Sequence, residues 1–273
     1  MVRGVVEPRR AIGGAHGTVA LWDLTDPTRP ARTATITFPR TPGRRTCSVG
    51  FSPHGRLLAV GGVHDDAAAV LWDVTDPARP VGTGRLEPPP AGGLMTASYA
   101  WWYAIAFSPT GRLLATAGEH HLMITHGDLT TGTRYGAVVV WDVTDPAHPA
   151  RRSILAQRGG QRPTPTRGQQ RKHGAVPMLT GHLRTPLTVA FSPDGRLLAT
   201  GGDDRTVMLW TITDPAQPRP TTTLLLPAAV RALTFHPNGH LLATAGDDPT
   251  TALWTVDQPV PAAAPKDPPT TAR

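Results

Sequence analysis

The segment FSPDGRLLATGGDDRTVMLWTITDP, residues 191–215, recurs along the chain with the same skeleton and different loops. Similar copies begin at Phe51, Phe107 and Phe235, and a partial copy, AIGGAHGTVALWDLTDP, begins at Ala11. Self-similarity of this kind is the sign of a repeat array, in which each unit needs its neighbours to bury a core. The repeat therefore predicts one continuous array rather than two independent domains.

Each copy carries one tryptophan near its end, and the spacing of these residues gives the size of the unit. The intervals are 50, 69, 69 and 44 residues, between Trp22, Trp72, Trp141, Trp210 and Trp254. The shortest interval lies within the ~40–45 residues of a four-stranded propeller blade, so the longer intervals contain insertions. Pro, Gly and Asp leave apolar runs of only four to seven residues, which suit strands and are too short for helices. These observations predict an all-β propeller.

The unit of residues 179–226 shows the expected strands most clearly. Its predicted strands are LRTPLTVAF, RLLATGG, TVMLWTI and RPTTTLLL, separated by turns at 192–195, 203–205 and 213–215. Proline and glycine supply the backbone angles that tight turns need. Four short antiparallel strands joined in this way form a meander, which is the unit of a propeller.

The same pattern divides the chain into about five blade units and a tail. The predicted units are 1–38, 45–86, 99–155, 179–226 and 229–257, with insertions at 119–135 and 156–178. The tail, 258–273, is rich in Pro and Ala and is predicted to be disordered. The first unit is predicted to lack its innermost strand and the last its outermost one, so we expect a small or unclosed propeller. An unclosed array exposes apolar faces and sheet edges, so we expect either self-association or a fragment of a longer protein.

Several short motifs are shared with a known family. They are the Trp-Asp pairs that begin at Trp22, Trp72 and Trp141, the Gly-His pair at Gly181, and the FSPxGRLLA core. On these motifs the chain resembles WD-repeat β-propeller proteins from residue 11 to about residue 257, and its WDVTDPARP ending is similar to bacterial arrays common in actinobacteria. The resemblance implies a non-catalytic scaffold or sensing module that binds other proteins.

The resemblance also implies a buried, hydrogen-bonded tetrad of His, Ser or Thr, Asp and Trp that ties the strands of a blade together. The fourth unit matches this tetrad fully, with His182, Thr200, Asp204 and Trp210. The partial matches are Thr244, Asp248 and Trp254 in the last unit, and Asp66 and Trp72 in the second. Because buried polar groups must be satisfied, we interpret these residues as structural and not as catalytic.

The composition fits a protein of a reducing compartment. Cys47 is the single cysteine, so no internal disulfide is expected. No apolar stretch reaches the ~18 residues that a membrane-spanning helix needs, and the first residues do not resemble a signal sequence. The net charge of +7 comes from 25 Arg and 2 Lys, and it permits acidic partners without establishing them. We therefore expect a cytoplasmic protein with no membrane partner.

Binding is predicted on one face of the propeller, called the loop face below. This face carries the connections from the second strand to the third and from one unit to the next, where the large insertions lie. Loops on a rigid scaffold are the usual place of binding sites. The residues predicted to contact a partner are Tyr99, Trp101, Trp102, Tyr103, Arg158, Arg162, Arg167, Arg171 and Lys172. Two alternatives stay open: the aromatic residues pack beneath the loops, and the basic segment is a solvated loop.

Two other classes of function compete with protein binding. The Arg-rich insertion 156–174 has the charge to bind a polyanion or nucleic acid, but it lacks interleaved aromatic residues for base stacking. A metal-dependent enzyme would use the insertion 119–128, whose candidate ligands are His120, His121, His126 and Asp128, although their spacing is not that of a zinc site. The chain has no Gly-rich phosphate loop and no GxSxG motif. We predict no cofactor and no catalytic residue.

Overall fold

The computed structural model describes residues 2–6, 9–13, 18–37, 45–63, 69–87, 95–126, 129–156 and 181–256. These residues form five antiparallel sheets, and each sheet is built from strands that are consecutive in the chain. None of the described residues belongs to a helix long and apolar enough to cross a membrane. The predicted all-β architecture of successive meanders is confirmed.

The strand bounds follow the repeat units. The first sheet contains β1 (Val2–Val6), β2 (Arg9–Gly13), β3 (Thr18–Asp23) and β4 (Ala31–Thr37), and the second contains β5 (Arg45–Phe51), β6 (Leu57–Val63), β7 (Ala69–Asp73) and β8 (Val81–Leu86). The third sheet contains β9 (Met95–Phe107), β10 (Leu113–His126), β11 (Leu129–Asp142) and β12 (Ala150–Ala156). The fourth contains β13 (Pro186–Phe191), β14 (Leu197–Gly202), β15 (Thr206–Thr211) and β16 (Arg219–Leu225). The last contains β17 (Val230–Phe235), β18 (Leu241–Gly246) and β19 (Thr251–Thr255).

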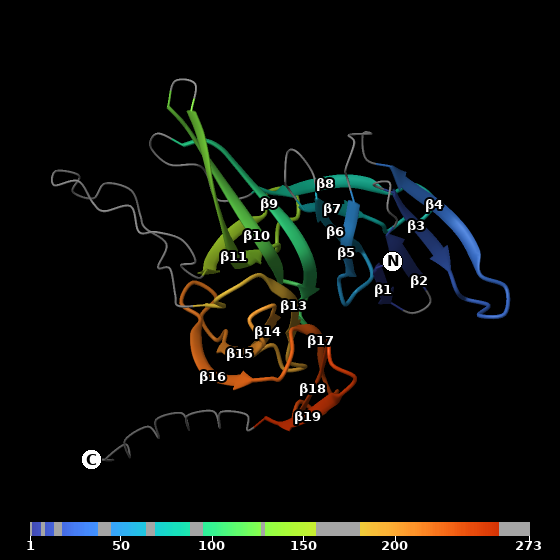
Figure 1. Ribbon diagram of the computed structural model, residues 1–273. Helices are drawn as coiled ribbons and strands as arrows, with labels where there is room; N and C mark the ends of the chain where they lie inside the picture. The colour runs from blue at the N-terminus through green and yellow to red at the C-terminus, as the bar shows by residue number, and fades with distance from the viewer. Residues whose placement is uncertain are drawn as a thin grey trace, which may run out of the picture.

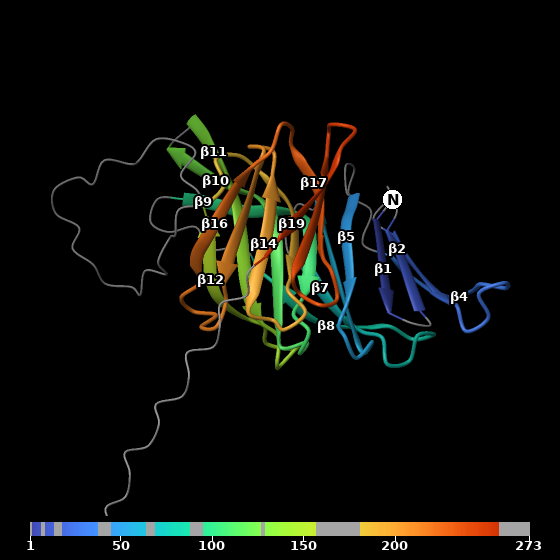
Figure 2. The same cartoon turned by 90° about the horizontal axis from the view of Figure 1, so that it is seen from below.

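The five sheets follow one another in chain order around a central axis (Figure 1). Their innermost strands are β1, β5, β9, β13 and β17, and each packs against the next one. Figure 2 shows the same succession of sheets from below. The arc stays open between β1–β4 and β17–β19, so the described part of the chain does not close a ring.

The first sheet is more complete than predicted. The prediction that the first unit lacks its innermost strand is wrong, because β1 pairs with β2 from Val2↔Gly13 to Val6↔Arg9. Strand pairing needs main-chain hydrogen bonds and residues that favour extended backbone, such as the valines of β1, rather than a particular motif. The first unit has no FSPxG turn, which marks the innermost strand elsewhere in the sequence. In the described residues the last sheet has three strands, as predicted for a unit without its outermost strand.

The insertion 119–135 continues the sheet and is not a surface loop. The strands β10 and β11 stay paired without a break from Leu113↔Asp142 to His126↔Leu129. The strand β9 runs back along β10 as far as Met95, and these strands project beyond the rest of the third sheet (Figure 1). Because the extra residues are divided between two adjacent strands rich in Thr and apolar side chains, they lengthen the hairpin instead of forming a bulge.

The recurring Ser-Pro-x-Gly turn has one geometry wherever it occurs. The serine hydroxyl accepts a hydrogen bond from the main-chain N–H five residues further on, at 3.0 Å for Ser52, 3.0 Å for Ser108 and 2.9 Å for Ser192. The glycine at the end of the turn has a positive φ, for example +72° at Gly195, which other residues rarely adopt. The turn thus explains why Ser and Gly recur in the FSPxG motif.

The core of the molecule lies between adjacent sheets, where four clusters of buried apolar side chains fill the four contacts. The residue that precedes the recurring tryptophan shows the pattern. It is 3%, 0%, 0% and 6% exposed in the first four units, at Leu21, Leu71, Val140 and Leu209. In the last unit the equivalent Leu253 is 69% exposed, because no described sheet covers this face. Each unit therefore depends on the following unit to bury one of its faces.

Candidate functional site

A buried hydrogen-bonded network ties together the strands of the fourth sheet. The Nδ1 atom of His182 donates to Asp204 Oδ1 at 3.0 Å, and Nε2 of the same ring lies 2.8 Å from Thr200 Oγ1. Trp210 donates from Nε1 to the same Thr200 hydroxyl at 3.1 Å. The four residues of the tetrad that the resemblance implies are thus in direct contact.

Asp204 is the charged member of this network. Burial raises the pKa of this carboxyl, but hydrogen bonds from His182 and Thr206 outweigh burial and hold the pKa below its usual value. The Thr206 hydroxyl donates to Oδ1 at 2.7 Å, and the main-chain N–H of Leu183 donates to Oδ2. Since a buried charge is costly unless it is paired, this arrangement holds the strands together and satisfies the carboxylate at the same time.

The last and second units retain only parts of the network. In the last unit Trp254 donates to Thr244 Oγ1 at 3.0 Å, while Leu226 stands where the histidine is expected. The Asp248 carboxylate accepts a hydrogen bond from the neighbouring Thr250 hydroxyl instead. In the second unit Trp72 is half-buried, and Asp66 lies outside the described residues.

The third unit contains a Trp–Thr pair that the sequence analysis did not single out. Trp141 donates from Nε1 to Thr116 Oγ1 at 3.1 Å, and both residues are buried. Thr116 ends the LLAT motif of the third unit, as Thr200 does in the fourth, and Trp141 and Trp210 are the recurring tryptophans of these two units. An alignment of the two motifs would have revealed it.

We expect Thr116→Val to lower the free energy of unfolding by about 1–2 kcal/mol, because the buried Trp141 N–H loses its acceptor while the shape of the side chain is kept. Urea unfolding followed by circular dichroism measures this difference. As the control, Thr222→Val changes an exposed threonine of β16 and is expected to stay within about 0.5 kcal/mol of the wild type. Equal stability of Thr116→Val and wild type would contradict a role of this hydrogen bond.

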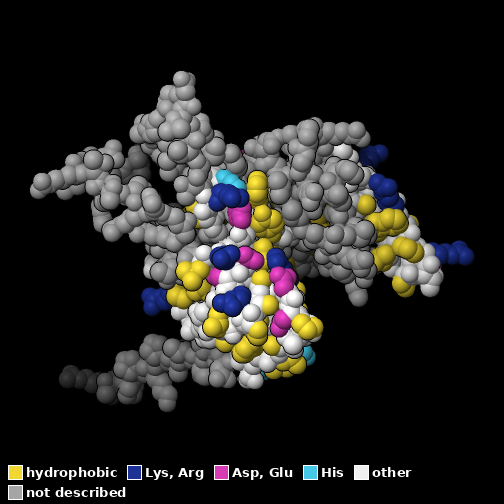
Figure 3. All heavy atoms as spheres, viewed as in Figure 1, with side chains coloured by type: hydrophobic (Ala, Val, Ile, Leu, Met, Phe, Trp, Pro, Cys, Tyr) yellow, Lys and Arg dark blue, Asp and Glu magenta, His cyan; other side chains and the backbone are white. Residues whose placement is uncertain are grey.

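A row of charged side chains crosses the loop face from the third unit to the last. The carboxylates of Glu119, Asp203 and Asp247 follow the same glycine of the LLATxG motif in three successive units. The Arg231 guanidinium donates to both oxygens of Asp247, at 2.7 and 2.6 Å, and lies 3.9 Å from Asp203. Figure 3 shows positively and negatively charged side chains interspersed on this face. Arg231 therefore links the last unit to the fourth at the surface.

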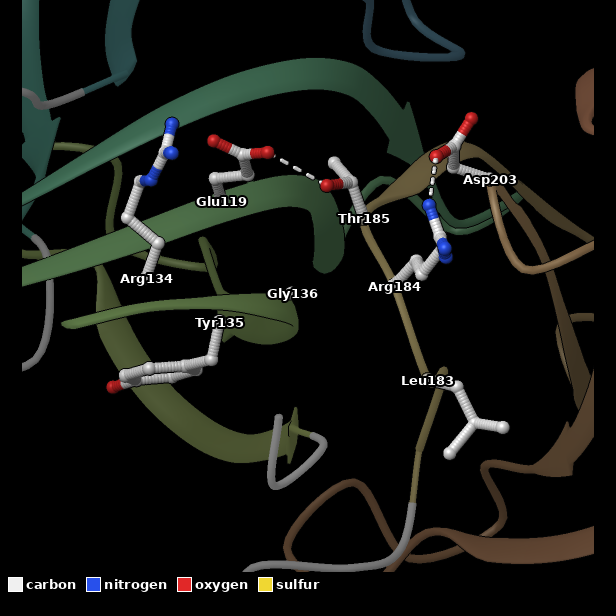
Figure 4. Close-up of a pocket in the computed structure, with 8 residues that line it drawn as sticks. All are labelled: Glu119, Arg134, Tyr135, Gly136, Leu183, Arg184, Thr185 and Asp203. Carbon is white, nitrogen blue, oxygen red and sulfur yellow. Dashed lines mark hydrogen bonds and ion pairs between the residues drawn. The ribbon is translucent and has the colours of Figure 1, made fainter. Parts of the chain in front are cut away.

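A cavity of about 340 Å³ opens between the third and fourth units and is called the inter-unit pocket below (Figure 4). Its lining residues are Glu119, Arg134, Tyr135 and Gly136 from the β10–β11 hairpin, and Leu183, Arg184, Thr185 and Asp203 from the fourth unit. The Thr185 hydroxyl donates to Glu119 Oε1 at 2.7 Å and joins the two walls. A Cβ on Gly136 would lie 2.6 Å from the main-chain oxygen of Arg184, so glycine is needed for this close approach.

The Glu119 carboxylate is held in its ionised form. A hydrogen bond from His121 lowers its pKa, burial opposes this effect, and the Thr185 hydroxyl and the positive charge of Arg134 lower the pKa further. The Nε2 atom of His121 lies 3.3 Å from Glu119 Oε2. Groups of the protein itself therefore already occupy both oxygens of this carboxylate.

The two neighbouring histidines of β10 do not converge on one point. His120 is fully buried and is hydrogen-bonded to the Tyr135 hydroxyl, whereas His121 contacts Glu119 and the ring of Trp101. Adjacent strand residues point to opposite faces, which separates the two rings. Burial lowers the pKa of His120 to about 4 and raises that of Tyr135 to about 12. Within the described residues no group of three or more His, Cys, Asp or Glu side chains could hold a metal ion.

Other predicted site residues lie outside the described part of the structure. They include two metal-ligand candidates, because the side chain of His126 and the whole of Asp128 are outside the described part. They also include the basic residues of the long insertion, namely Arg158, Arg162, Arg167, Arg171 and Lys172.

The aromatic residues before the third inner strand have different environments. Trp102 is fully buried in the core between the second and third sheets, so its assignment to an interaction surface is wrong. The alternation of side chains along β9 turns it inward, and Trp101 next to it is half-buried with its ring 4.2 Å from that of His121. Tyr103 is also half-buried, and the side chain of Tyr99 lies outside the described residues.

Comparison with known families identifies the repeat. Residues 175–211 and 219–255 match the family model of the WD domain, G-beta repeat. These two segments of the chain match WD40 repeats. The matched segments are two consecutive units, one of which holds the complete tetrad. The resemblance to WD-repeat propellers on the sequence motifs is thereby confirmed.

Comparison with solved structures agrees with this identification. A chain in the crystal structure of the mitotic checkpoint complex has a TM-score of 0.60 to this chain, with 18% sequence identity. The match covers 93% of this chain and 62% of the other one, so this chain spans less than two thirds of the length of its neighbour. At this identity the similarity shows the fold alone. No curated protein matches the sequence.

Proposed function

We propose that this chain is a non-catalytic protein-interaction module that binds its partner through the loop face. The observation that carries the proposal is the charged row on this face, which spans three units and borders a pocket built from two of them. A partner that lies across the row contacts several units at once, and the rigid sheets fix the positions of those contacts.

In the described residues the turns of the opposite face are alike from one unit to the next. Its turns repeat one structure, in which an aspartate accepts a hydrogen bond from the main-chain N–H two residues further on, at 2.9 Å or 3.0 Å. These aspartates are Asp26, Asp76, Asp145 and Asp214. Uniform turns serve the scaffold, whereas the loop face differs from unit to unit, which is the pattern of a binding surface. The structural neighbour is itself part of a complex, which agrees with this proposal.

Affinity capture from cell extract with three forms of the chain tests the proposed function. The loop-face variant carries Trp101→Ala, Leu183→Glu and Arg231→Ala, and the opposite-face variant carries Arg79→Ala and Gln217→Ala. We expect the loop-face variant to lose at least about 90% of a partner that the wild type captures, because truncation of a few central contacts removes most of the binding energy. The opposite-face variant is expected to keep this partner.

The measurement is quantitative mass spectrometry of the captured proteins, with circular dichroism to show that each variant is folded. If every captured protein is retained equally by the loop-face variant, binding does not use this face and the proposal fails.

A further inference from the structure

We propose that the inter-unit pocket binds an acidic side chain from an extended segment of a partner protein, next to an apolar residue of the same segment. This inference rests on the proposed function and specifies the chemistry of its partner. Three features of the pocket support it: guanidinium groups that donate no hydrogen bond within the described residues, a small volume, and an exposed apolar side chain.

The unused groups of the pocket are donors. Arg134 is exposed, and within the described residues its guanidinium donates no hydrogen bond. The Arg184 side chain is 71% exposed, and its nearest acidic oxygen, on Asp203, is 3.7 Å from Nη1, beyond hydrogen-bond distance. Guanidinium groups present planar sets of N–H donors that match the two oxygens of a carboxylate. Figure 4 shows these two arginines extending from different walls of the pocket.

The two carboxylates of the pocket lie beside donors or positive charges of the protein. Glu119 accepts a hydrogen bond from Thr185 and contacts His121, and Asp203 forms ion pairs with Arg184 and Arg231 at 3.7 and 3.9 Å. A basic side chain entering the pocket would compete with these groups for the same carboxylates. An acidic side chain instead adds acceptors where donors are unused, so charge complementarity favours a carboxylate.

The pocket also offers an apolar contact at its edge. Leu183 is 72% exposed and lines the cavity beside Arg184. The volume of about 340 Å³ is at the lower end for ligand pockets and suits one or two side chains of a peptide. In a segment with an acidic residue followed by a large apolar residue, the carboxylate meets a pocket arginine while the apolar side chain contacts Leu183.

Fluorescence anisotropy with two labelled peptides tests this inference on the full chain. The probe is Gly-Ser-Glu-Leu-Glu-Leu-Ser-Gly, and its matched control replaces both Glu by Gln. We expect the Glu peptide to bind at least about tenfold more tightly, because a hydrogen bond between charged groups is worth more than a neutral one. Arg134→Ala and Arg184→Ala are each expected to weaken the binding of the Glu peptide about tenfold.

Arg79→Ala is the matched control variant, because Arg79 is exposed in a turn of the opposite face. It is expected to leave the affinity of the Glu peptide unchanged. Equal affinity for the two peptides, no binding of the Glu peptide, or the same loss in Arg79→Ala as in the pocket variants would overturn the inference.

Capture from cell extract with the double variant Arg134→Ala, Arg184→Ala separates this inference from the proposed function. A partner that is lost by the loop-face variant and by the double variant supports both. A partner that is lost by the loop-face variant but kept by the double variant overturns the pocket inference and leaves the proposed function standing.

Discussion

Replacement of Trp210 by alanine is expected to lower the free energy of unfolding by about 3–5 kcal/mol, the range for truncation of a large buried aromatic side chain. Trp210 is 0% exposed and packs between the third and fourth sheets. Its removal opens a cavity at this contact and leaves the Thr200 hydroxyl without its indole donor. The measurement is urea unfolding followed by tryptophan-independent far-ultraviolet circular dichroism.

The matched control for this prediction is Trp254→Ala in the last unit. Trp254 donates an equivalent hydrogen bond to Thr244, but its ring is half-buried. We therefore expect a smaller loss of stability than for Trp210→Ala, because less apolar surface leaves water there on folding. Equal losses at the two positions would show that burial between sheets does not set the stability of a unit.

The variant Asp204→Ala is expected to lose about 3 kcal/mol of stability, since removal of a buried carboxylate leaves its hydrogen-bond donors unsatisfied. The carboxylate accepts hydrogen bonds from His182, Thr206 and the main chain of Leu183. As the control, Asp248→Ala removes the equivalent aspartate of the last unit, which accepts from Thr250, and it is expected to cost less than about 1 kcal/mol. Urea unfolding of both variants decides between these values, and a loss below about 1 kcal/mol in both would contradict a stabilising tetrad.

The contribution of Asp204 also has a definite dependence on pH. Its folded-state pKa lies below the unfolded value of about 3.9, because of the hydrogen bonds from His182 and Thr206. Such a carboxyl contributes its full stability above the unfolded pKa and loses it as the pH falls through the folded value. The difference in stability between the wild type and Asp204→Asn is therefore expected to be complete at about pH 6 and to shrink below about pH 4. A difference that stays constant over this range would contradict the lowered pKa.

The parts of the fold that depend on local pattern could be predicted from the sequence. The turn at 192–195 carries Pro and Gly at the positions that the backbone requires, and the strands of the fourth unit follow from the apolar runs between such turns. The tetrad residues are in contact because their places in the repeat bring them to one end of the same sheet.

The parts that depend on contacts between units could not be predicted from local pattern. Glu119 and Thr185 are separated by 66 residues, and only the packing of the third unit against the fourth joins them. The burial of Trp102 likewise depends on the neighbouring sheet, because its sequence context suits an exposed and a buried aromatic residue equally. The strand β1 was missed since it carries none of the recurring motif.

The open arc of sheets has a consequence for the order in which the chain folds. In the described residues each buried cluster joins two successive sheets, and none joins the first sheet to the last. Among the described sheets none needs a segment from the far end of the array to complete its core, so loop closure between the first and last sheets adds no entropic cost to their folding barrier. Nucleation in any unit can therefore spread to its neighbours one sheet at a time, as in a linear solenoid. An inner sheet gains two interfaces as folding passes through it, whereas the first and the last of the described sheets gain one each.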